Sequence, residues 1–498
     1  MTQWNPVIED SLKIKKYIKI NRKVGSKMYK NNTINKIAKV KGLVAVGAFA
    51  LCVTSPFALA KSTSEEIAKL GLEGTELTPV GAVRAGNAEG TIPEWKNERI
   101  KAPSDFVEGQ YHTDPFRDDK IKFTITSKNY TEHADKLSEG QIAMFKTYPD
   151  WFMNVYETRR SAVYAPYIYE AALENAGTAE IVLAPDKGQG IVGFKNAHHS
   201  WAFPIPKNGN ELLMSQATRP LNVWVDSMEQ TLAITSTGKF TVNQLSIQQH
   251  YKYSDPDIEN FDPETDHLHY YQTLLAPAKV AGQVVLAKDP VSFTKKFRGA
   301  WAYSPGQRRV KRAPQIVYDN PLTATDGLAT TDQKWGYNGP NDRFNWKMLG
   351  KKEIYVPYNA YKLHSVDATI DKVITPQGRL NMDYARYELH RVWILEGTLK
   401  EGTTHDYARR VMYLDEDSFF IMVADSYDRR GQIWRYWEDH DVMYYDIGFM
   451  APAAEFQYDM QAGRMVALLF DKANPPDFTG RWEDKYFTPA SIRRNGVR

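Results

Sequence analysis

The chain has 498 residues, one cysteine and a formal net charge of +3, and 42% of its residues are hydrophobic. This length allows two or three domains and a sizeable core, although β-rich domains often exceed the usual domain size. The basic balance does not indicate nucleic-acid binding. It is confined to the first 60 residues, which carry eleven Lys and Arg and two acidic residues, and the rest of the chain has a net charge of −6.

These first 60 residues have the pattern of a secretory signal peptide. The basic stretch leads into the uncharged run Gly42 to Ala60, which ends in Ala58-Leu59-Ala60. A basic region, an apolar region and a small-residue cleavage site together predict removal of residues 1–60. An uncleaved anchor is the alternative, since the uncharged run approaches the roughly 20 residues that span a bilayer. Pro56 and the small residues favour cleavage, and Met28 would open a signal of more ordinary length.

The only cysteine, Cys52, lies within this signal. The exported chain can therefore form neither a disulfide nor a thiolate metal site. No second uncharged stretch of spanning length follows, so we expect no transmembrane span after processing. We also expect no cofactor.

The rest of the chain divides into three regions that differ in composition and hydrophobic periodicity. Residues 61–118 are rich in Gly, Pro and polar residues, which predicts an extended leader packed on the body. The next stretch contains two helical patterns, "TEHADKLSEGQIAMFKTYPDWFM" and "APYIYEAALENAG". From Glu180 onward, short runs rich in Val, Ile, Tyr, Phe and Trp are separated by turn clusters, and this close spacing favours antiparallel hairpins. Residues 119–498 are thus predicted to form one α+β, β-rich domain.

Four consecutive runs, "HRVWILEGTL", "YARRVMYL", "SFFIMVADSY" and "GQIWRYW", are joined by turn sequences. One joint holds the acidic residues Asp415, Glu416 and Asp417. At a hairpin tip these carboxylates would lie in water with ordinary acidities, so we expect a turn rather than a catalytic cluster. Replacing Asp415 and Asp417 by Asn should then change stability by only about 0.5 kcal/mol.

The strands beside this joint are apolar on both faces. Such a strand is either sandwiched inside the protein or lines an apolar cavity with one face. Side chains in a strand alternate, so Phe419, Ile421 and Val423 are expected to face one way, and Phe420 and Met422 the other. The candidate cavity residues are Val392, Ile394, Phe419, Phe420, Ile421, Met422 and Val423.

Several short motifs resemble binding signatures but lack their context. "GQGIVG", Gly188 to Gly193, is not followed by the helix that a dinucleotide site needs. The adjacent His198 and His199 cannot both face one ion from a regular strand. "SFTK", Ser292 to Lys295, has none of the companion motifs of penicillin-binding enzymes.

Three histidines, His390, His405 and His440, fall at the ends of neighbouring predicted strands and could converge in space. Polar residues at sheet edges are the simpler interpretation. We therefore predict no catalytic residue and no metal site.

A compact basic cluster occurs in "GQRRVKRAPQ", where Arg308, Arg309, Lys311 and Arg312 place four cations within five residues. The favoured interpretation is a strand edge that its charges protect from pairing with another chain. The alternative is a contact for phosphate or carboxylate head groups or for a partner protein, because the planar guanidinium binds both anions through two hydrogen bonds.

Five longer segments occur in order along most of residues 65–470. They are "LTPVGAVRAGNAEGTIPEW", "WAFPIPKNGNE", "GQRRVKRAPQIVYDNP", "GKKEIYVPYNAYKLH" and the stretch from "RYELHRVWILEGTLK" through "DSYDRRGQIWR". These segments resemble a large, poorly characterised family of Gram-negative periplasmic proteins, grouped with the LolA/LolB-like outer-membrane lipoprotein-sorting proteins. The resemblance implies a large antiparallel sheet curved into a half-barrel, with helices on its concave side and an apolar cavity for acyl chains. It implies no catalytic residues.

The resemblance predicts a periplasmic carrier or chaperone that binds a lipid or lipoprotein acyl chain for envelope or outer-membrane traffic. Its expected partners are this ligand and an envelope transporter or outer-membrane protein. The chain is much longer than the lipoprotein carriers, so their cargo is not carried over. Two alternatives remain open: a periplasmic hydrolase, which needs a His and a carboxylate converging near a Ser, and an assembly factor whose cavity is filled by its own side chains.

Overall fold

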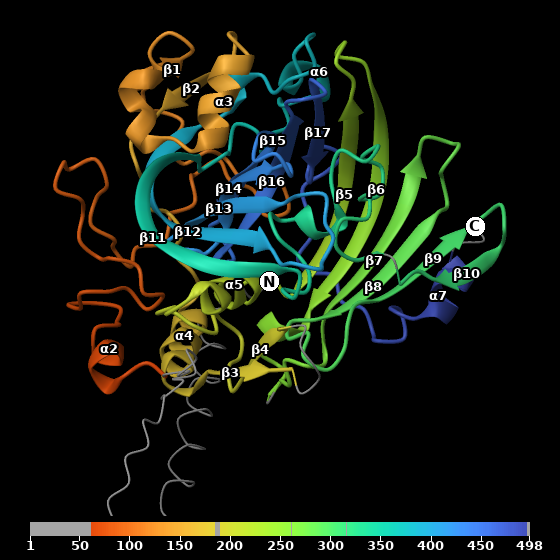
Figure 1. Ribbon diagram of the computed structural model, residues 1–498, viewed down its shortest axis with the longest axis horizontal. Helices are drawn as coiled ribbons and strands as arrows, with labels where there is room; N and C mark the ends of the chain where they lie inside the picture. The colour runs from red at the N-terminus through yellow and green to blue at the C-terminus, as the bar shows by residue number, and fades with distance from the viewer. Residues whose placement is uncertain (1–60, 185–189, 260, 315, 496–498) are drawn as a thin grey trace, which may run out of the picture. The chain divides into compact units, whose positions relative to one another are not determined.

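Figure 1 shows the computed structural model of the protein, which describes residues 61–184, 190–259, 261–314 and 316–495. The predicted signal peptide, residues 1–60, lies outside the described residues. Within the described ranges, no helix is both long enough and apolar enough to cross a bilayer.

One sheet of fifteen strands forms the body of the structure. Its strand order runs from β1 and β2 through β12 to β17, and then through β5 to β10, while β11 pairs with β12 beside this path. The described registers are antiparallel apart from one parallel pair between Val155 of β2 and Tyr387 of β12. The strands of this sheet are β1 Phe123–Thr126, β2 Phe152–Val155, β5 Trp224–Ile234, β6 Phe240–Tyr251, β7 Asp266–Ala276, β8 Val284–Pro290, β9 Gly299–Ser304, β10 Arg309–Arg312, β11 Phe344–Pro357, β12 Tyr387–Leu399, β13 Arg409–Asp415, β14 Ile421–Tyr427, β15 Ile433–Tyr444, β16 Phe449–Asp459 and β17 Arg464–Leu469.

The sheet is curved and open. In Figure 1, β11 arcs around one side while β5 to β10 fan out on the other, and β1 and β10 stand at the two ends of the strand order. The predicted α+β, β-rich class with a large curved antiparallel sheet is confirmed. The four predicted hairpin strands are β12 to β15. Gly402 and Gly431 support the turns before β13 and β15, because their φ angles of 78° and 75° suit glycine.

A few helices pack against this sheet, and β3 (Glu180–Leu183) and β4 (Val192–Lys195) form a separate small sheet. The two helices predicted from the sequence are α3 and α4. Helix α5 was not predicted; it begins after the Asn208 cap and contacts β11 and β12. The helices are α2 Ser64–Ala68, α3 Glu139–Thr147, α4 Pro166–Thr178, α5 Gly209–Ala217, α6 Ile370–Val373 and α7 Pro489–Asn495, with 3-10 turns at η1 Tyr130–Lys136, η2 Lys252–Ser254, η3 Thr331–Gln333 and η4 Met382–Tyr384.

Residues 61–118 contain the short helix α2 and are otherwise irregular. Four of their side chains, Val80, Ala82, Ile92 and Trp95, are buried in the main hydrophobic core. The segment therefore contributes to the same core as the sheet.

Strand β14 does not keep simple alternation. Its pairing with β13 passes from Tyr413–Val423 to Leu414–Ile421, so Met422 is an extra residue that forms a β-bulge. Because the bulge shifts the alternation by one residue, Ile421 and Val423 do not share a face as the sequence had suggested.

Both faces of β14 are covered. Ile421 lies against Gly336, where a Cβ atom would approach its own Cβ to 2.7 Å. Asp425 lies against α3 and accepts a 3.1 Å hydrogen bond from the Ser138 hydroxyl. Phe419 precedes the strand and has a φ of 58°, a left-handed conformation that is uncommon outside glycine.

Candidate functional site

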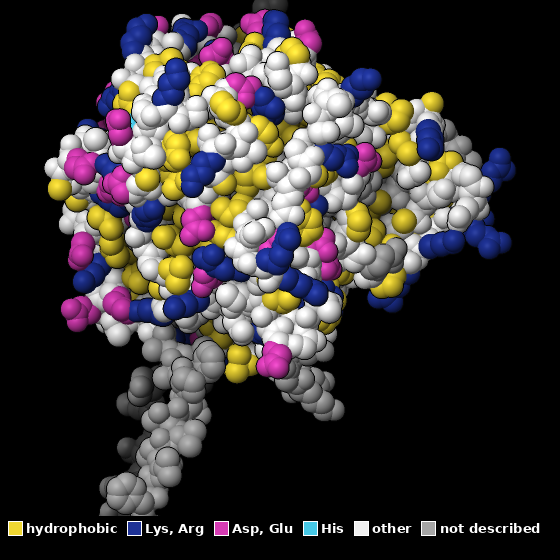
Figure 2. All heavy atoms as spheres, turned by 45° about the horizontal axis from the view of Figure 1, so that its top comes forward, with side chains coloured by type: hydrophobic (Ala, Val, Ile, Leu, Met, Phe, Trp, Pro, Cys, Tyr) yellow, Lys and Arg dark blue, Asp and Glu magenta, His cyan; other side chains and the backbone are white. Residues whose placement is uncertain are grey.

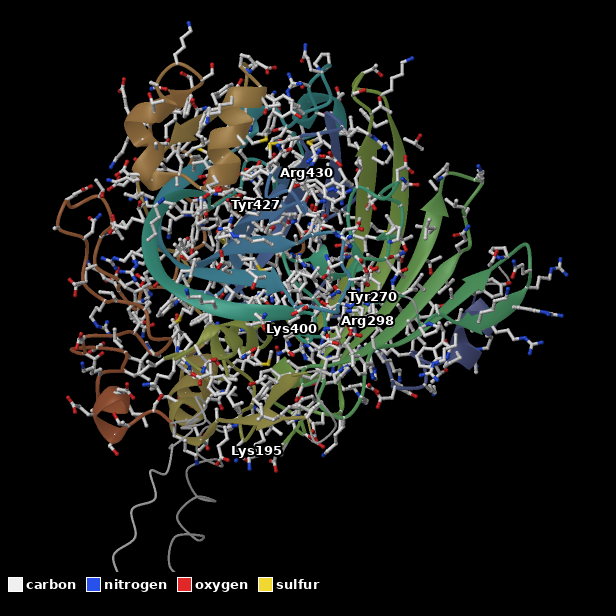
Figure 3. All side chains as sticks on the ribbon, in the orientation of Figure 1. Lys195, Tyr270, Arg298, Lys400, Tyr427 and Arg430 are labelled. Carbon is white, nitrogen blue, oxygen red and sulfur yellow. The ribbon has the colours of Figure 1, made fainter. Side chains whose placement is uncertain are left out.

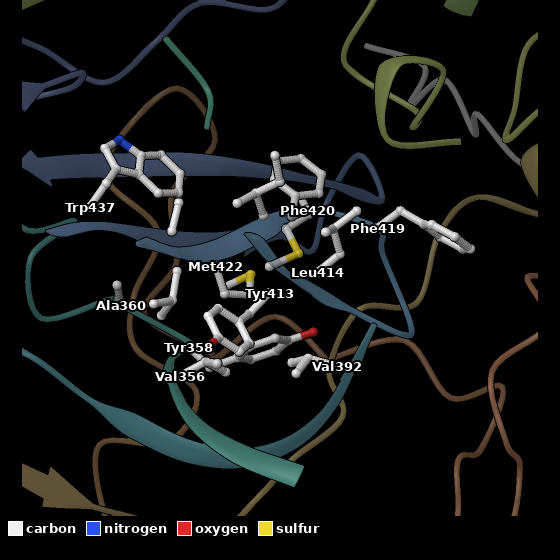
Figure 4. Packing of buried hydrophobic residues seen from close by; sticks show 14 of the residues in the cluster. Val356, Tyr358, Ala360, Val392, Tyr413, Leu414, Phe419, Phe420, Met422 and Trp437 are labelled. Atoms are coloured by element: carbon white, nitrogen blue, oxygen red, sulfur yellow. The ribbon is translucent and has the colours of Figure 1, made fainter. Parts of the chain in front are cut away.

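The predicted cavity residues lie in the closed core. Figure 4 shows Val392, Phe419, Phe420 and Met422 packed among other buried side chains. Ile421 and Val423 are likewise no more than 1% exposed, while Ile394 packs against the same core from its edge. None of the seven lines any of the three pockets described below. Strand β14 is sandwiched inside the protein, because α3 covers one of its faces and the segment around Gly336 covers the other.

The acidic residues 415–417 form a turn, as predicted, but the prediction that the turn is solvated is wrong. Asp415, Glu416 and Asp417 are at most 2% exposed. Asp417 accepts hydrogen bonds of 2.8 and 2.7 Å from the Arg160 guanidinium. Burial opposes the ionisation of Asp417, yet Arg160 and further cations outweigh it and lower the pKa of this carboxyl.

The neighbouring Glu416 also has cationic partners. It accepts hydrogen bonds of 2.7 Å from Lys351 and 3.0 Å from Arg391. The backbone N–H of Val83 donates to the same carboxylate at 3.2 Å, which ties the N-terminal segment to this turn. A buried turn of this kind is stable only because each carboxylate has a partner.

Asp415 contacts a histidine and a serine, the residue types of a hydrolase. His390 lies between two carboxylates. Its Nδ1 is 3.4 Å from Asp415, and its Nε2 is 3.3 Å from Glu388. Burial disfavours the charged ring, but the two carboxylates together raise the pKa of His390 to about 9. Ser418 donates its hydroxyl to Asp415 at 2.7 Å. Because both imidazole nitrogens face carboxylates, His390 is not placed to take a proton from Ser418, as a serine nucleophile would require.

The other two histidines pair elsewhere. His405 lies 3.0 Å from Asp332, and His440 lies 3.3 Å from Glu438. His390, His405 and His440 are therefore separate buried groups and not exposed sheet-edge residues.

The remaining motifs also occupy separate places. The described part of Gly188–Gly193 leads into strand β4 and not into a helix. The rings of His198 and His199 are perpendicular, with an interplanar angle of 90°. Ser292 lies 3.2 Å from the Thr294 hydroxyl, and Lys295 pairs with Glu264.

A pocket with mainly apolar walls lies over β5, β6 and β16. We call it the main pocket; its volume is about 60 Å³. Its apolar walls include Leu221, Val225, Tyr251, Trp335, Phe470 and Phe478. These residues come from four distant parts of the sequence, so no single stretch could have predicted the pocket.

Arg219 stands in the wall of this pocket and is only 6% exposed. Its Nη1 donates a 2.8 Å hydrogen bond to the carbonyl of Gln216, and its guanidinium carbon lies 4.6 Å from the Phe420 ring centre. Its Nε has no hydrogen-bond partner among the described residues. Burial lowers the pKa of Arg219, as expected for a cation removed from water.

Two buried acids influence Arg219. Asp439 and Asp441 interact with it electrostatically, and burial raises the pKa of both carboxyls well above the usual range. Both carboxyls are therefore harder to ionise than exposed acids. The wall of the main pocket thus combines apolar side chains with a buried guanidinium whose Nε has no hydrogen-bond partner among the described residues.

Trp335 joins the main pocket to two others. A second pocket of about 60 Å³ and a third of about 70 Å³ also have Trp335 in their walls. Arg219 lines the second pocket as well, and Tyr270 and Arg298, labelled in Figure 3, line the third. The Trp335 backbone is held by a 2.9 Å hydrogen bond from its N–H to Glu455. Burial raises the pKa of this glutamate to about 7.

The basic cluster lies on the last strand of the sheet. Arg308 precedes β10, the other three residues belong to it, and all four side chains are exposed. Helix α7 packs beside this strand and adds the exposed Arg493 and Arg494. Figure 2 shows a group of Lys and Arg side chains at the end of the molecule where Figure 1 places β10. The predicted position at a charged strand edge is confirmed.

The chain is similar to proteins from several bacteria. "Uncharacterized protein PA3922" of Pseudomonas aeruginosa is 38% identical over 461 residues, which cover 92% of this chain and 99% of that protein. The crystal structure of a DUF1329 family protein from Desulfovibrio piger is 14% identical, with a TM-score of 0.39 over 57% of this chain and 97% of that one. LolA superfamily protein NE2245 from Nitrosomonas europaea is 12% identical, with a TM-score of 0.35 over 57% of this chain and 98% of that one.

The family model described as "Protein of unknown function (DUF1329)" matches residues 124–493. This match confirms the resemblance to a poorly characterised family that the five sequence segments had indicated. The chain belongs to the DUF1329 family.

Proposed function

We propose that the protein is a periplasmic carrier for a lipid-like amphiphile that has an acyl chain and an acidic head. The observation that carries this proposal is the main pocket, where apolar walls meet the Arg219 guanidinium, whose Nε has no hydrogen-bond partner among the described residues. An acyl chain against the apolar walls would gain about 0.8 kcal/mol for each buried methylene. A carboxylate or phosphate would supply an acceptor for the Arg219 Nε.

The pocket must widen to admit such a chain. A volume of about 60 Å³ holds only a few water molecules. Because Trp335 lines all three pockets, we expect displacement of its side chain to merge them into one longer channel. We infer that Trp335 is the gate, and that the cost of moving it keeps affinity moderate, as a carrier that must release its cargo requires.

The basic edge of the sheet fits the delivery step. A strand edge with four exposed cations would be attracted to anionic head groups at a membrane surface, at about 1 kcal/mol for each cation near that surface. In this proposal β10 approaches the membrane during capture or release. Export through the signal peptide would place the protein in the periplasm, where it would meet these membranes.

Binding of a fluorescent fatty acid, compared with its uncharged methyl ester, tests the proposal. The wild-type protein should bind both probes. Arg219→Met should weaken binding of the acid at least about tenfold, equal to 1.4 kcal/mol, and leave the ester nearly unchanged. Trp335→Ala should bind both probes more tightly, because the gate is then open. Trp393→Ala, which removes a partly buried indole elsewhere in the sheet, is the matched control and should bind like wild type.

The outcome also separates the alternative functions. If neither probe binds to the wild type or to Trp335→Ala, the pockets are closed parts of the core and the carrier proposal fails. That result would favour an assembly factor that uses its surface alone. If Arg219→Met weakens binding of the fatty acid and of its methyl ester equally, Arg219 does not recognise an acidic head group, and that part of the proposal is wrong.

A further inference from the structure

Two buried histidines and an aspartate meet where the C-terminal segment crosses the sheet. His250 of β6 and His269 of β7 lie directly opposite each other in the strand register. One ligand atom of each, and one carboxylate oxygen of Asp484, lie within 4.8 Å of one another. Because strand side chains alternate, His250 points to the face opposite Gln249 and Tyr251, which line the main pocket. The three residues therefore form a separate place in the fold.

Each of these histidines has a carboxylate on the side of its Nε2 atom. His250 Nε2 lies 3.1 Å from Asp255, and His269 Nε2 lies 4.0 Å from Asp266. Neither Nδ1 atom has a hydrogen-bond partner among the described residues, although the two side chains are only 7% and 2% exposed. The Nδ1 of His269 lies 3.6 Å from an oxygen of Asp484. Buried nitrogen atoms without partners are rare, because each costs free energy, and a shared ligand would satisfy both of these atoms.

The surroundings orient the rings as metal-binding histidines are usually oriented. At His250, the Asp255 carboxylate on Nε2 fixes the tautomer and directs Nδ1 at the ion. Trp224 stacks on the His250 ring at 3.6 Å, and Phe487 packs 5.2 Å from the His269 ring. Both rings are thus held in place before any ion binds.

Carboxylates and lysines surround the site in equal number. Lys252 pairs with Asp484 at 2.8 Å, Lys296 pairs with Asp266 at 2.7 Å, and Lys288 is the register neighbour of His269 on β8. The three carboxylates are those of Asp255, Asp266 and Asp484. A divalent ion would displace Lys252 from the Asp484 carboxylate.

We propose that His250, His269 and Asp484 bind a divalent transition metal of the zinc class. Two imidazole nitrogens and one carboxylate oxygen are a donor set that suits such ions. The exposed side of Asp484 would leave at least one coordination position to water. The ion would fasten the C-terminal segment, with Asp484 and Phe487, to strands β6 and β7.

The test is titration of untagged, chelator-stripped full-length protein with Zn²⁺ and with Co²⁺, followed by calorimetry and by the visible absorption of bound Co²⁺. One ion should bind per chain, and the melting temperature should rise with it. His250→Gln and His269→Gln should each weaken binding at least about 100-fold and abolish the rise. His198→Gln removes a half-buried histidine elsewhere and should bind like wild type.

Asp484→Asn tests the site independently of the histidine variants, which change buried side chains. We expect it to be well tolerated, since the Asp484 side chain is 68% exposed. It should fold normally, as judged by circular dichroism without metal. It should bind Co²⁺ more weakly than the wild type does, and the visible spectrum of the bound Co²⁺ should change. Failure of the wild type to bind one ion at micromolar concentration would overturn the proposal. Binding that the two His→Gln variants leave unchanged would overturn it equally.

Discussion

Arg160 and Asp417 form an ion pair in which both side chains are 2% exposed. The same guanidinium also donates to the backbone carbonyls of Val83 and Arg84, so one residue links the turn to the N-terminal segment. Removing a single member of such a pair leaves a buried charge without a partner. We therefore expect Arg160→Met and Asp417→Asn each to lower the free energy of unfolding by about 3–5 kcal/mol in denaturant titrations.

The exposed pair of Arg117 and Asp105 is the matched control, because its two side chains are 53% and 51% exposed. Arg117→Met should cost less than about 1 kcal/mol. Similar small losses for the buried and the exposed variants would show that the acidic turn is solvated in solution, as the sequence alone had suggested.

Asp425 makes stability depend on pH in the opposite direction from an ion-paired acid. Burial raises the pKa of Asp425 to about 7, from its usual value near 4. The folded state therefore keeps this proton up to about pH 7, whereas the unfolded chain releases it near pH 4. The stabilisation from this group is complete below about pH 4 and is lost as the pH rises towards 7.

Asp425→Asn should remove this loss, because asparagine is uncharged and can still accept the hydrogen bond from Ser138. Between pH 4 and pH 8, the wild type should lose about 2–4 kcal/mol more stability than the variant. Urea titrations at both pH values measure this difference. Asp118→Asn, at an exposed position, should leave the pH profile unchanged. An identical profile for Asp425→Asn and wild type would contradict the burial of this carboxyl.

The acidic turn shows why the burial and the ion pairs of single residues could not be predicted from the sequence. Its letters "DED" are typical of a solvated joint, and the turn was correctly placed. Its partners Arg160, Lys351 and Arg391 are distant in the chain, and nothing in the local pattern reveals that they will cover it.

At the scale of single elements, β10 offers a direct test of the charged edge. Changing Arg308, Arg309, Lys311 and Arg312 together to Gln should reduce co-sedimentation with vesicles that contain anionic lipids by at least about tenfold at low salt. The wild-type binding should weaken as salt is added, because exposed charges are screened. Stability should stay within about 0.5 kcal/mol, since the side chains are exposed.

A variant with the same charge change is the control. Lys96, Lys101, Lys120 and Lys122 are four exposed lysines at other positions. Their replacement by Gln should leave vesicle binding largely intact. If both variants lose binding equally, attraction depends on net charge alone and β10 is simply a protected edge.

Helices and strands could be predicted where a short stretch of sequence determines the local structure. Short runs rich in apolar and aromatic residues, separated by turn sequences, predicted β12 to β15, and helical periodicity predicted α3 and α4. The sequence missed α5, because its apolar residues Leu212, Leu213 and Met214 are consecutive and do not follow the spacing of a surface helix. It also missed the bulge at Met422, which depends on how β13 pairs with β14.

At the scale of the whole molecule, the class and the antiparallel sheet followed from the sequence, whereas the pocket did not. The predicted cavity strand is packed on both faces, and the pocket lies instead where β5, β6 and β16 meet Trp335. Its nearest sequence signal is a tryptophan within the polar, Gly-rich stretch "TDQKWGYNGPND". The meeting of β17 with β5, which brings the two halves of the sheet together, spans more than 200 residues and has no local signature.

Native mass spectrometry of the full-length protein, purified without detergent from the cells that make it, tests the carrier proposal most directly. We expect a population whose mass exceeds that of the processed chain by one acidic lipid or fatty acid. The extra mass should be released on unfolding, and the population that carries it should fall sharply in Arg219→Met. A protein that carries no such molecule, and that gains none when incubated with membranes from the same cells, would contradict the carrier proposal.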